Sequence, residues 1–260
     1  MRCSEESCIR IPNPDHTMIE LKHGFSRQRL FANHVSLLDL IVPATYQHYE
    51  GRYIPLLYKK TRRYTNVIDL TQDTEVLLAK MKSNTRNEVR RAEREGVVCE
   101  FTEDLAGFVP FYNAFAQEKG LDSSLTIHGL EQYGNVLVGV SKHDEAVLSM
   151  HATAFDDCLH KALLLYSCSP RIEEDVDRKL IGRGNRYLHF REFEHFKQMG
   201  MTEYDWNGVC LDPEQTERYN IGLFKQAFGG ENKENIWLES PLYIMGDWFR
   251  KKMGISNAID

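Results

Sequence analysis

Residues 136–168 read VLVGVSKHDEAVLSMHATAFDDCLHKALLLYSC, and this stretch decides the fold. It contains three runs rich in apolar and β-branched residues, separated by short polar segments of the kind found in turns: Val136–Ser141, Ala146–Ala154 and Leu159–Cys168. Connections this short join antiparallel neighbours. The stretch therefore predicts three consecutive antiparallel strands.

Helices and single strands alternate on both sides of this stretch. Before it, the apolar spacing predicts a strand at 66–70, a helix at 73–95, a strand at 97–101 and a helix at 105–119. After it, we expect a helix at 184–199, a strand at 203–206, a helix at 220–228 and a strand at 235–239. This order predicts an α+β (mixed α/β layered) fold and not a regular doubly wound sheet.

The ends of the chain differ from this main body. Residues 1–16 are polar and predict a loose arm, whereas the apolar runs Ser36–Val42 and Tyr53–Tyr58 predict two strands joined by a hairpin turn. We therefore expect an N-terminal arm and strand-rich extension at 1–65, a main domain at 66–245, and a basic, then polar tail at 246–260.

Composition excludes several classes of protein. The 260 residues are 42% hydrophobic and 27% charged, which is ordinary for a globular protein and excludes fibrous or disordered chains. The net charge of −6 argues against a general nucleic-acid coat protein. The six scattered cysteines match no common metal-ligand spacing and indicate reduced thiols. Because no common ligand spacing is present, we expect no metal. Because there is neither a signal-peptide pattern nor a long apolar span, we expect a cytoplasmic protein.

A glycine-containing segment, Lys179–Gly184, lies between a predicted strand and a predicted helix. Glycines there allow backbone N–H groups to converge on a phosphate, and the helix N-terminus adds a positive field. The side chains of Lys179, Arg183 and Arg186 can add charge-assisted contacts. The alternative is an ordinary strand–helix loop with solvated basic residues.

The segment Lys80–Arg94 carries six basic residues, among them Arg90 and Arg91. One interpretation is a binding site for an anionic ligand, such as a nucleotide-linked substrate or tRNA; the other is a solvated helix face.

Other candidates for chemistry follow the predicted strand at 203–206. Asp205 is a candidate general base beside Trp206, although the Asp-Trp-Asn-Gly sequence also suits a turn. Tyr219 is a candidate acid, and Lys225 is either a phosphate contact or a surface residue. His151, in the middle predicted strand, is a candidate base or a packed core histidine.

Four segments together resemble a known family: NVIDLTQDTEVLLAKMKSNTRNEVRRAERE (66–95), IGRGNRYLHF (181–190), YDWNGV (204–209) and IGLFKQAFGG (221–230). In this order they are similar to the acyltransferase domain of Fem-related proteins, a branch of the GNAT (Gcn5-related N-acetyltransferase) superfamily. The resemblance covers about two thirds of the chain, from 66 to 240. It implies a splayed, mostly antiparallel sheet flanked by helices, with acyl-CoA in the opening.

The resemblance also implies roles for particular residues. The backbone of Gly182, Arg183 and Gly184 would hold the CoA pyrophosphate, with Lys179 in the first position of the phosphate loop. The strand residues that would pair with the pantetheine amides are Leu164, Leu165, Tyr166 and Ser167. Asp205 would lie near the acceptor amine. Independently of the resemblance, the residues we expect to contact the substrate are Arg90, Arg91, Trp206 and Lys225.

The implied reaction is direct transfer of an acyl group, most simply acetyl, from acyl-CoA to a primary amine of a small or nucleotide-linked acceptor. Fem ligases carry two such domains and use aminoacyl-tRNA, and the length of this chain leaves room for one. We therefore favour acyl-CoA, with a tRNA-dependent ligase acting on a cell-wall precursor and a non-catalytic GNAT-like binding module as alternatives. The oligomeric state stays open.

Overall fold

The computed structural model describes residues 19–121, 124–170 and 178–253, and the predicted arm at 1–16 lies outside them. The chain divides into two compact units. Unit 1 holds the residues up to Thr61 together with the segment from Ile236, and unit 2 holds Arg62–Asn235. Two strands run from one unit into the other: β4 (Lys59–Asp69) and β10 (Glu231–Glu239).

Unit 2 is built on a mixed sheet with the strand order β10-β4-β9-β8-β7-β6-β5. The strands not yet given are β5 (Val98–Thr102), β6 (Asn135–His143), β7 (Ala146–Asp156), β8 (Lys161–Cys168) and β9 (Glu203–Asp205). Antiparallel pairing joins β5 to β6, β6 to β7, β7 to β8 and β4 to β9, whereas β8 and β9 run parallel. The mostly antiparallel α+β fold predicted from the sequence is confirmed.

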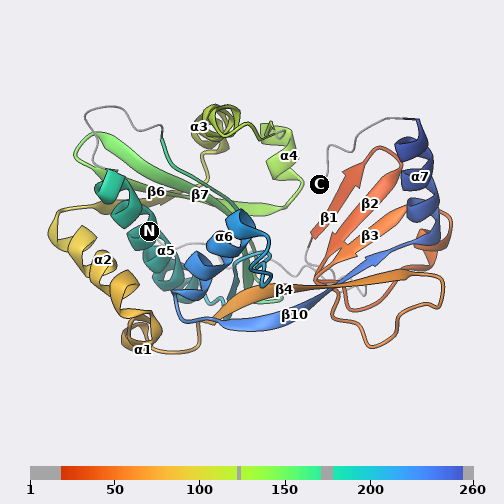
Figure 1. Cartoon of the computed structure of the whole chain (residues 1–260), viewed down its shortest axis with the longest axis horizontal. Coiled ribbons are helices and arrows are strands. Elements are labelled where there is room, and N and C mark those ends of the chain that lie inside the picture. The colour runs from red at the N-terminus through yellow and green to blue at the C-terminus, as the bar shows by residue number, and fades with distance from the viewer. Residues whose placement is uncertain (1–18, 122–123, 171–177, 254–260) are drawn as a thin grey trace, which may run out of the picture. The chain divides into compact units, whose positions relative to one another are not determined.

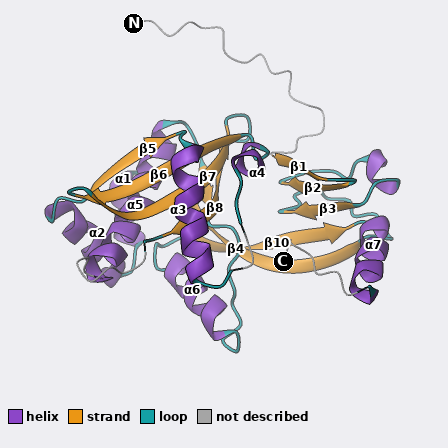
Figure 2. Cartoon of the chain, turned by 90° about the horizontal axis from the view of Figure 1, so that it is seen from above, coloured by secondary structure: helices purple, strands orange, loops and turns teal. Residues whose placement is uncertain are grey.

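Helices cover both faces of this sheet. On one face lie α1 (Thr74–Lys80), α2 (Ser83–Arg94) and α5 (Arg178–Gln198); on the other lie α3 (Leu105–Glu118) and α4 (Ile127–Glu131) (Figure 1). Helix α3 crosses β7 and β8 (Figure 2) and turns Phe108, Tyr112 and Ala116 to the inside. Helix α6 (Thr216–Gln226) adds Phe224 to an aromatic cluster with α5.

The predicted helix at 73–95 is wrong in one respect, because it is two helices. Met81 and Lys82 are extended, with ψ angles of 146° and 144°. Met81 is buried in the core, and the Lys82 N–H donates to the carbonyl of Ala227 at 2.9 Å instead of continuing the helix. A long-range contact therefore outweighs the helical spacing.

Unit 1 contains β1 (Ile19–His23), β2 (Ser26–Leu30), β3 (Ala44–Gln47) and the end of β10, with α7 (Pro241–Lys252) and the short 3₁₀ helix η1 (Leu37–Leu40). The predicted strands Ser36–Val42 and Tyr53–Tyr58 are wrong: the first is mainly η1, and the second belongs to a loop. Part of the expected tail is α7, which Ser240 caps by accepting the Tyr243 N–H. Among the described residues, no helix combines the length and hydropathy needed to cross a membrane.

Candidate functional site

Strands β8 and β9 pair at three positions and then part. Their register joins Lys161 to Glu203, Ala162 to Tyr204, and Leu163 to Asp205. Strand β8 nevertheless continues to Cys168, paired with β7. Within the described ranges, Leu164–Cys168 thus has a strand neighbour on one side alone, and its other edge offers backbone groups that an extended ligand can pair with.

This unpaired part of β8 also contains a bulge. Tyr166 lies opposite Ala152, and Leu164 lies opposite Thr153, so Leu165 has no partner residue on β7. A bulge redirects the backbone N–H and C=O groups around it, and bulges are common beside active sites. The predicted pantetheine strand, Leu164–Ser167, spans the bulge.

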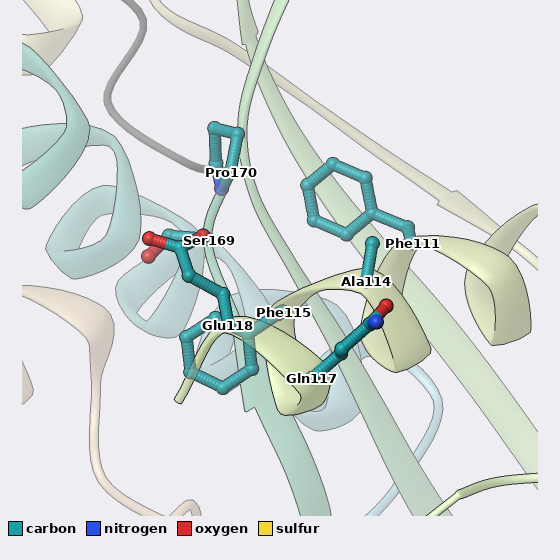
Figure 3. A pocket seen from close by; sticks show the side chains of 7 residues that line it. All are labelled: Phe111, Ala114, Phe115, Gln117, Glu118, Ser169 and Pro170. Atoms are coloured by element: carbon teal, nitrogen blue, oxygen red, sulfur yellow. The ribbon is translucent and has the colours of Figure 1, made fainter. Parts of the chain in front are cut away.

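A pocket of about 460 Å³ opens just beyond the end of β8. Phe111, Ala114 and Phe115 project into it from α3, opposite Ser169 and Pro170 from the strand end (Figure 3). Gln117 and Glu118 complete its lining. Its aromatic walls and few polar groups are typical of a small-molecule site.

A smaller hollow of about 150 Å³ shares Phe115 and Glu118 with this pocket and reaches Arg178 and Ile181 in the first turn of α5. The first turn of a helix has backbone N–H groups without intrahelical partners, which attract anions. Lys179, exposed in the same turn, adds a cation. The pocket and the smaller hollow together thus extend from α3 to the start of α5, and no sequence motif predicted the α3 residues that line them.

The segment Lys179–Gly184 is helical, so the predicted loop with a helix beginning at Gly184 is wrong. A Cβ atom on Gly184 would lie 2.6 Å from Leu148 of β7, so Gly184 allows α5 to approach the sheet. Arg183 is buried and forms an ion pair with Glu95 at 2.7 Å, and Arg186 donates to the Gly182 carbonyl at 2.9 Å. Burial lowers the pKa of Arg186. These groups serve packing in this structure.

The basic face of α2 is exposed, as its sequence suggests. Arg90 and Arg94 lie one turn apart on the surface. Arg91 donates to the Glu95 carboxylate at 2.7 Å, and the hydrogen bond from Arg91 is the main cause of the lowered pKa of Glu95. Since Glu95 also holds Arg183, one carboxylate occupies two of the arginines predicted to bind anions.

Asp205 ends β9 in a buried, hydrogen-bonded position. Its carboxylate accepts from the Thr65 hydroxyl and from the Asn207 N–H at 2.7 Å. Asn207 and Gly208 both have positive φ angles, of 54° and 69°, and the chain bends at Asn207. The predicted turn does not reverse the chain, because Val209 forms an antiparallel bridge with Tyr64, further along β4 from the pair of Asp205 with Val67. The turn holds the carboxylate at the point where β8 and β9 separate.

Lys225 of α6 fastens this turn. Its ammonium donates to the carbonyls of Trp206, Asn207 and Gly208 at 2.8, 2.7 and 2.7 Å. Burial lowers its pKa to about 8, against the opposing charge of Asp205. Lys225 therefore positions the turn through hydrogen bonds.

Two other predicted residues are placed differently. Trp206 is buried and packs on His189, Phe193, Tyr204, Phe224 and Phe228, so its ring belongs to the core. Tyr219 is half-buried on α6, and among the described residues no hydrogen bond links it to Asp205.

His151 is part of a buried polar network around Glu192 of α5. The sequence did not suggest that Glu192 would be buried. Glu192 accepts hydrogen bonds from His151 at 2.9 Å, His189 at 3.1 Å, Tyr204 at 3.0 Å and Thr153 at 3.2 Å. The other ring nitrogen of His151 meets the Asn185 side chain at 2.7 Å.

The charges in this network follow from burial and from its hydrogen bonds. Burial acts to raise the pKa of Glu192, but the histidines outweigh it and the pKa falls to about 2. Burial, and then the neighbouring His151, lowers the pKa of His189 to about 3. The network thus contains a buried carboxylate and a neutral His189 at neutral pH.

His151, His189 and Glu192 also place ligand-type atoms within 4.8 Å of one another. The two imidazole rings are stacked at 3.9 Å and 26°, so their in-plane nitrogen lone pairs point side by side and do not converge. The hydrogen bonds alone account for the cluster, and its geometry is that of a packed core network.

Comparisons with known proteins locate the fold. No family model matches the sequence, and no curated protein matches it either. The crystal structure of FemX superposes with a TM-score of 0.58 at 15% identity, over 76% of this chain and 65% of FemX. The chain therefore spans slightly less than two thirds of FemX.

Two further solved structures match over more of their length. One is the C-terminal domain assigned to a lysylphosphatidylglycerol synthetase from Agrobacterium fabrum: TM-score 0.57, 11% identity, 89% of this chain and 84% of that one. The other is L-PGS from Bacillus licheniformis, which superposes with a TM-score of 0.54 at 12% identity, over 85% of this chain and 79% of that one. At these identities the likeness shows the fold alone: the chain has a fold similar to that of FemX, as the resemblance to Fem-related proteins predicted.

Proposed function

We propose that this chain is an acyltransferase that moves an acyl group from acyl-CoA to a primary amine. The observation that carries the proposal is the edge of β8 beyond Leu163, which pairs with no strand of the described residues on its β9 side and ends beside a pocket. A pantetheine arm is an extended chain with two amide groups, and such a chain pairs with a free strand edge.

The residues around this strand edge suit the phosphates and the base of acyl-CoA. The first turn of α5 and Lys179 offer backbone N–H groups and a cation to the phosphates, next to the smaller hollow. The walls of Phe111 and Phe115 offer apolar and stacking surface to a base.

The proposed chemistry is direct attack without an enzyme-bound intermediate. The amine nitrogen forms a bond to the thioester carbonyl carbon, the C–S bond breaks, and the thiolate takes a proton from water. Asp205 accepts the proton that the amine loses, and backbone N–H groups near the Leu165 bulge stabilise the oxyanion. Lys225 acts as a positioning residue because it fixes the 206–208 turn.

A second candidate is aminoacyl transfer from tRNA. The exposed cationic face of α2, with Arg90 and Arg94, supports it, as does the likeness to a domain assigned to a lysylphosphatidylglycerol synthetase. Filter binding with mixed tRNA tests this candidate: salt-sensitive binding that Arg90→Glu and Arg94→Glu abolish would favour it.

The acyl-CoA proposal is tested by blocking the pocket. Ala114 is exposed on α3 and lines the pocket, so Ala114→Trp fills it without disturbing the core. Ala106→Trp, on the same helix and also exposed, is the matched control. We expect acetyl-CoA to raise the melting temperature of the wild type and of Ala106→Trp, and to leave Ala114→Trp unchanged.

Release of free thiol, measured with a panel of amines, gives the catalytic readout. Acyl-CoA that neither shifts the melting temperature nor yields thiol would contradict the proposal. Binding without thiol release from any amine would favour a non-catalytic GNAT-like module instead.

A further inference from the structure

The short helix η1 in unit 1 buries its charged residue and exposes its apolar residues. In the sequence Leu37-Leu38-Asp39-Leu40, the aspartate is fully buried, whereas Leu37 is 83% exposed and Leu40 is 58% exposed. Ile41, directly after the helix, is 74% exposed. Isolated exposed leucines are ordinary, but a turn that buries its one charge and presents its leucines to water is not.

A second apolar segment lies beside η1. Leu56 is 96% exposed, and Tyr53 and Leu57 are each 75% exposed. The hydroxyl of Tyr58, which follows Leu57, donates to the Asp39 carbonyl at 3.2 Å, so the two segments are tied together. We call this surface the apolar tip, defined as Leu37, Leu40, Ile41, Tyr53, Leu56 and Leu57.

The apolar tip rests on a built polar support. The Asp39 carboxylate accepts a hydrogen bond from the Tyr46 hydroxyl and lies 3.6 Å from the guanidinium of Arg29, which is also buried. These contacts hold Asp39 inside and thereby fix the outward direction of the leucines. Their exposure is therefore a property of the fold.

Positive charge borders the apolar tip. Arg52 precedes Tyr53, and Lys59 and Lys60 follow the Leu56-Leu57 pair; all three are exposed, and Lys59 forms an ion pair with Glu239 at 2.7 Å. The acidic residues of the segment 33–61 are Asp39, which is buried, and Glu50, which is exposed, so the exposed charge of the segment is still positive. In a chain with a net charge of −6, this gathering of cations beside exposed leucines is local and opposite to the overall charge.

We propose that the apolar tip docks unit 1 onto an anionic lipid bilayer. Leucine, isoleucine and tyrosine side chains enter the boundary between headgroups and acyl chains, while Arg52 and Lys60 meet the anionic headgroups. A second copy of the chain fits less well, since a twofold contact through this surface would bring like charges together. The proposal goes beyond the acyltransferase activity and does not depend on it.

Cosedimentation of the full chain with vesicles tests the proposal. We expect the wild type to bind vesicles of phosphatidylcholine mixed equally with phosphatidylglycerol, more strongly than phosphatidylcholine alone, and less strongly as salt rises. Two double variants, Leu56→Glu/Leu57→Glu and Leu37→Glu/Ile41→Glu, change exposed side chains in different segments. Each should lower the partition coefficient by at least about tenfold.

The control is Val76→Glu/Val98→Glu, which makes the same change of charge at exposed apolar residues of unit 2. It should bind like the wild type apart from a small electrostatic loss. Arg52→Glu/Lys60→Glu should lower binding to the anionic vesicles and leave binding to phosphatidylcholine unchanged.

Three results would overturn the proposal. The wild type does not sediment with anionic vesicles at low salt, or both leucine double variants sediment as it does. The third result is a wild-type dimer, detected by light scattering, that the double variants lose. It would assign the apolar tip to contact between copies of the chain.

Discussion

The two faces of the unit 2 sheet use their side chains differently. Under α5, Glu192, His151 and Arg183 are buried, and each is held by a named partner. Under α3, the ordinary residues Phe111, Ala114 and Phe115 line an open pocket. Residue types that suggest chemistry in a sequence are thus used for packing under α5, while the pocket of about 460 Å³ is lined by ordinary residues of α3.

The largest expected effect on stability lies at the centre of the α5 face. Glu192→Gln removes the charge that accepts hydrogen bonds from His151, His189, Tyr204 and Thr153, and it leaves buried donors without an acceptor. We expect the free energy of unfolding to fall by about 3–5 kcal/mol. Guanidinium unfolding at neutral pH measures it.

The control for this variant is Glu194→Gln, two residues along α5. Glu194 pairs with Arg191 at 3.0 Å near the surface, and we expect a change below about 1 kcal/mol. Equal effects of the two variants would mean that the Glu192 network does not hold this face together.

The next effect separates the two glycines of the segment that resembles a phosphate loop. A methyl group on Gly184 would lie 2.6 Å from Leu148, whereas on Gly182 its nearest neighbour is the flexible end of Arg186 at 3.4 Å. Gly184→Ala should therefore cost about 1–3 kcal/mol by overpacking. Gly182→Ala should be neutral or stabilise by up to about 1 kcal/mol through helix propensity.

Thermal and guanidinium unfolding of the two single variants measure this difference. If Gly182→Ala destabilised the protein as much as Gly184→Ala, the segment would not be a regular helix packed through Gly184, and the phosphate-loop prediction would regain its original form.

Acid should lower the stability of the protein through buried groups of the α5 face. The pKa of His189 is lowered from 6.5 to about 3, so between these values the unfolded chain binds the proton more readily than the folded protein. The free energy of unfolding therefore falls as the pH decreases below 6.5, by about 1 kcal/mol at about pH 5.5. Glu192 adds a second loss as the pH falls below its ordinary value of 4.5 towards about 2.

Tyr133 and Tyr166 on the α3 face should not contribute to this loss, since burial raises the pKa of each and both stay neutral in acid. Urea unfolding across this pH range measures the slope for the wild type and for His189→Gln, which keeps a donor but does not titrate. An unchanged slope in His189→Gln would show that the acid sensitivity comes from elsewhere.

The fold was predictable where neighbours along the chain determine it. The alternating runs at 136–168 predict β6, β7 and β8, and the spacing at 105–119 predicts α3 almost to the residue. The break at Met81 and Lys82 depends on the distant carbonyl of Ala227. The outward leucines of η1 depend on Asp39 meeting Tyr46 and Arg29. No local pattern contains such contacts.

The candidate site was predictable only in part, for a related reason. The Asn207-Gly208 turn and its Asp205 follow from local sequence, because those residue types favour turns wherever they occur. The bulge at Leu165 depends on the register between β7 and β8. The pocket depends on small and aromatic residues of α3, such as Ala114, whose type does not distinguish them from any other helix.

The smallest effect on stability, and the sharpest on the α3 face, is expected at Glu118. This exposed carboxylate lines both the pocket and the hollow that reaches the start of α5, where we propose that the donor phosphates bind. Glu118→Gln should change the free energy of unfolding by less than about 0.5 kcal/mol. It should tighten acyl-CoA binding by roughly twofold to fivefold, since it removes a like charge near the phosphates.

Isothermal titration with acetyl-CoA measures this change, and Glu103→Gln, at an exposed position just before α3, is the control for net charge. Tightening in Glu118→Gln alone would place the donor phosphates beside the hollow that Glu118 and the start of α5 line. Equal tightening in both variants would mean that acyl-CoA senses only the overall charge. If neither Glu118→Gln nor Ala114→Trp alters binding, the donor binds away from this pocket, and the contrast between a packed face and a binding face no longer holds.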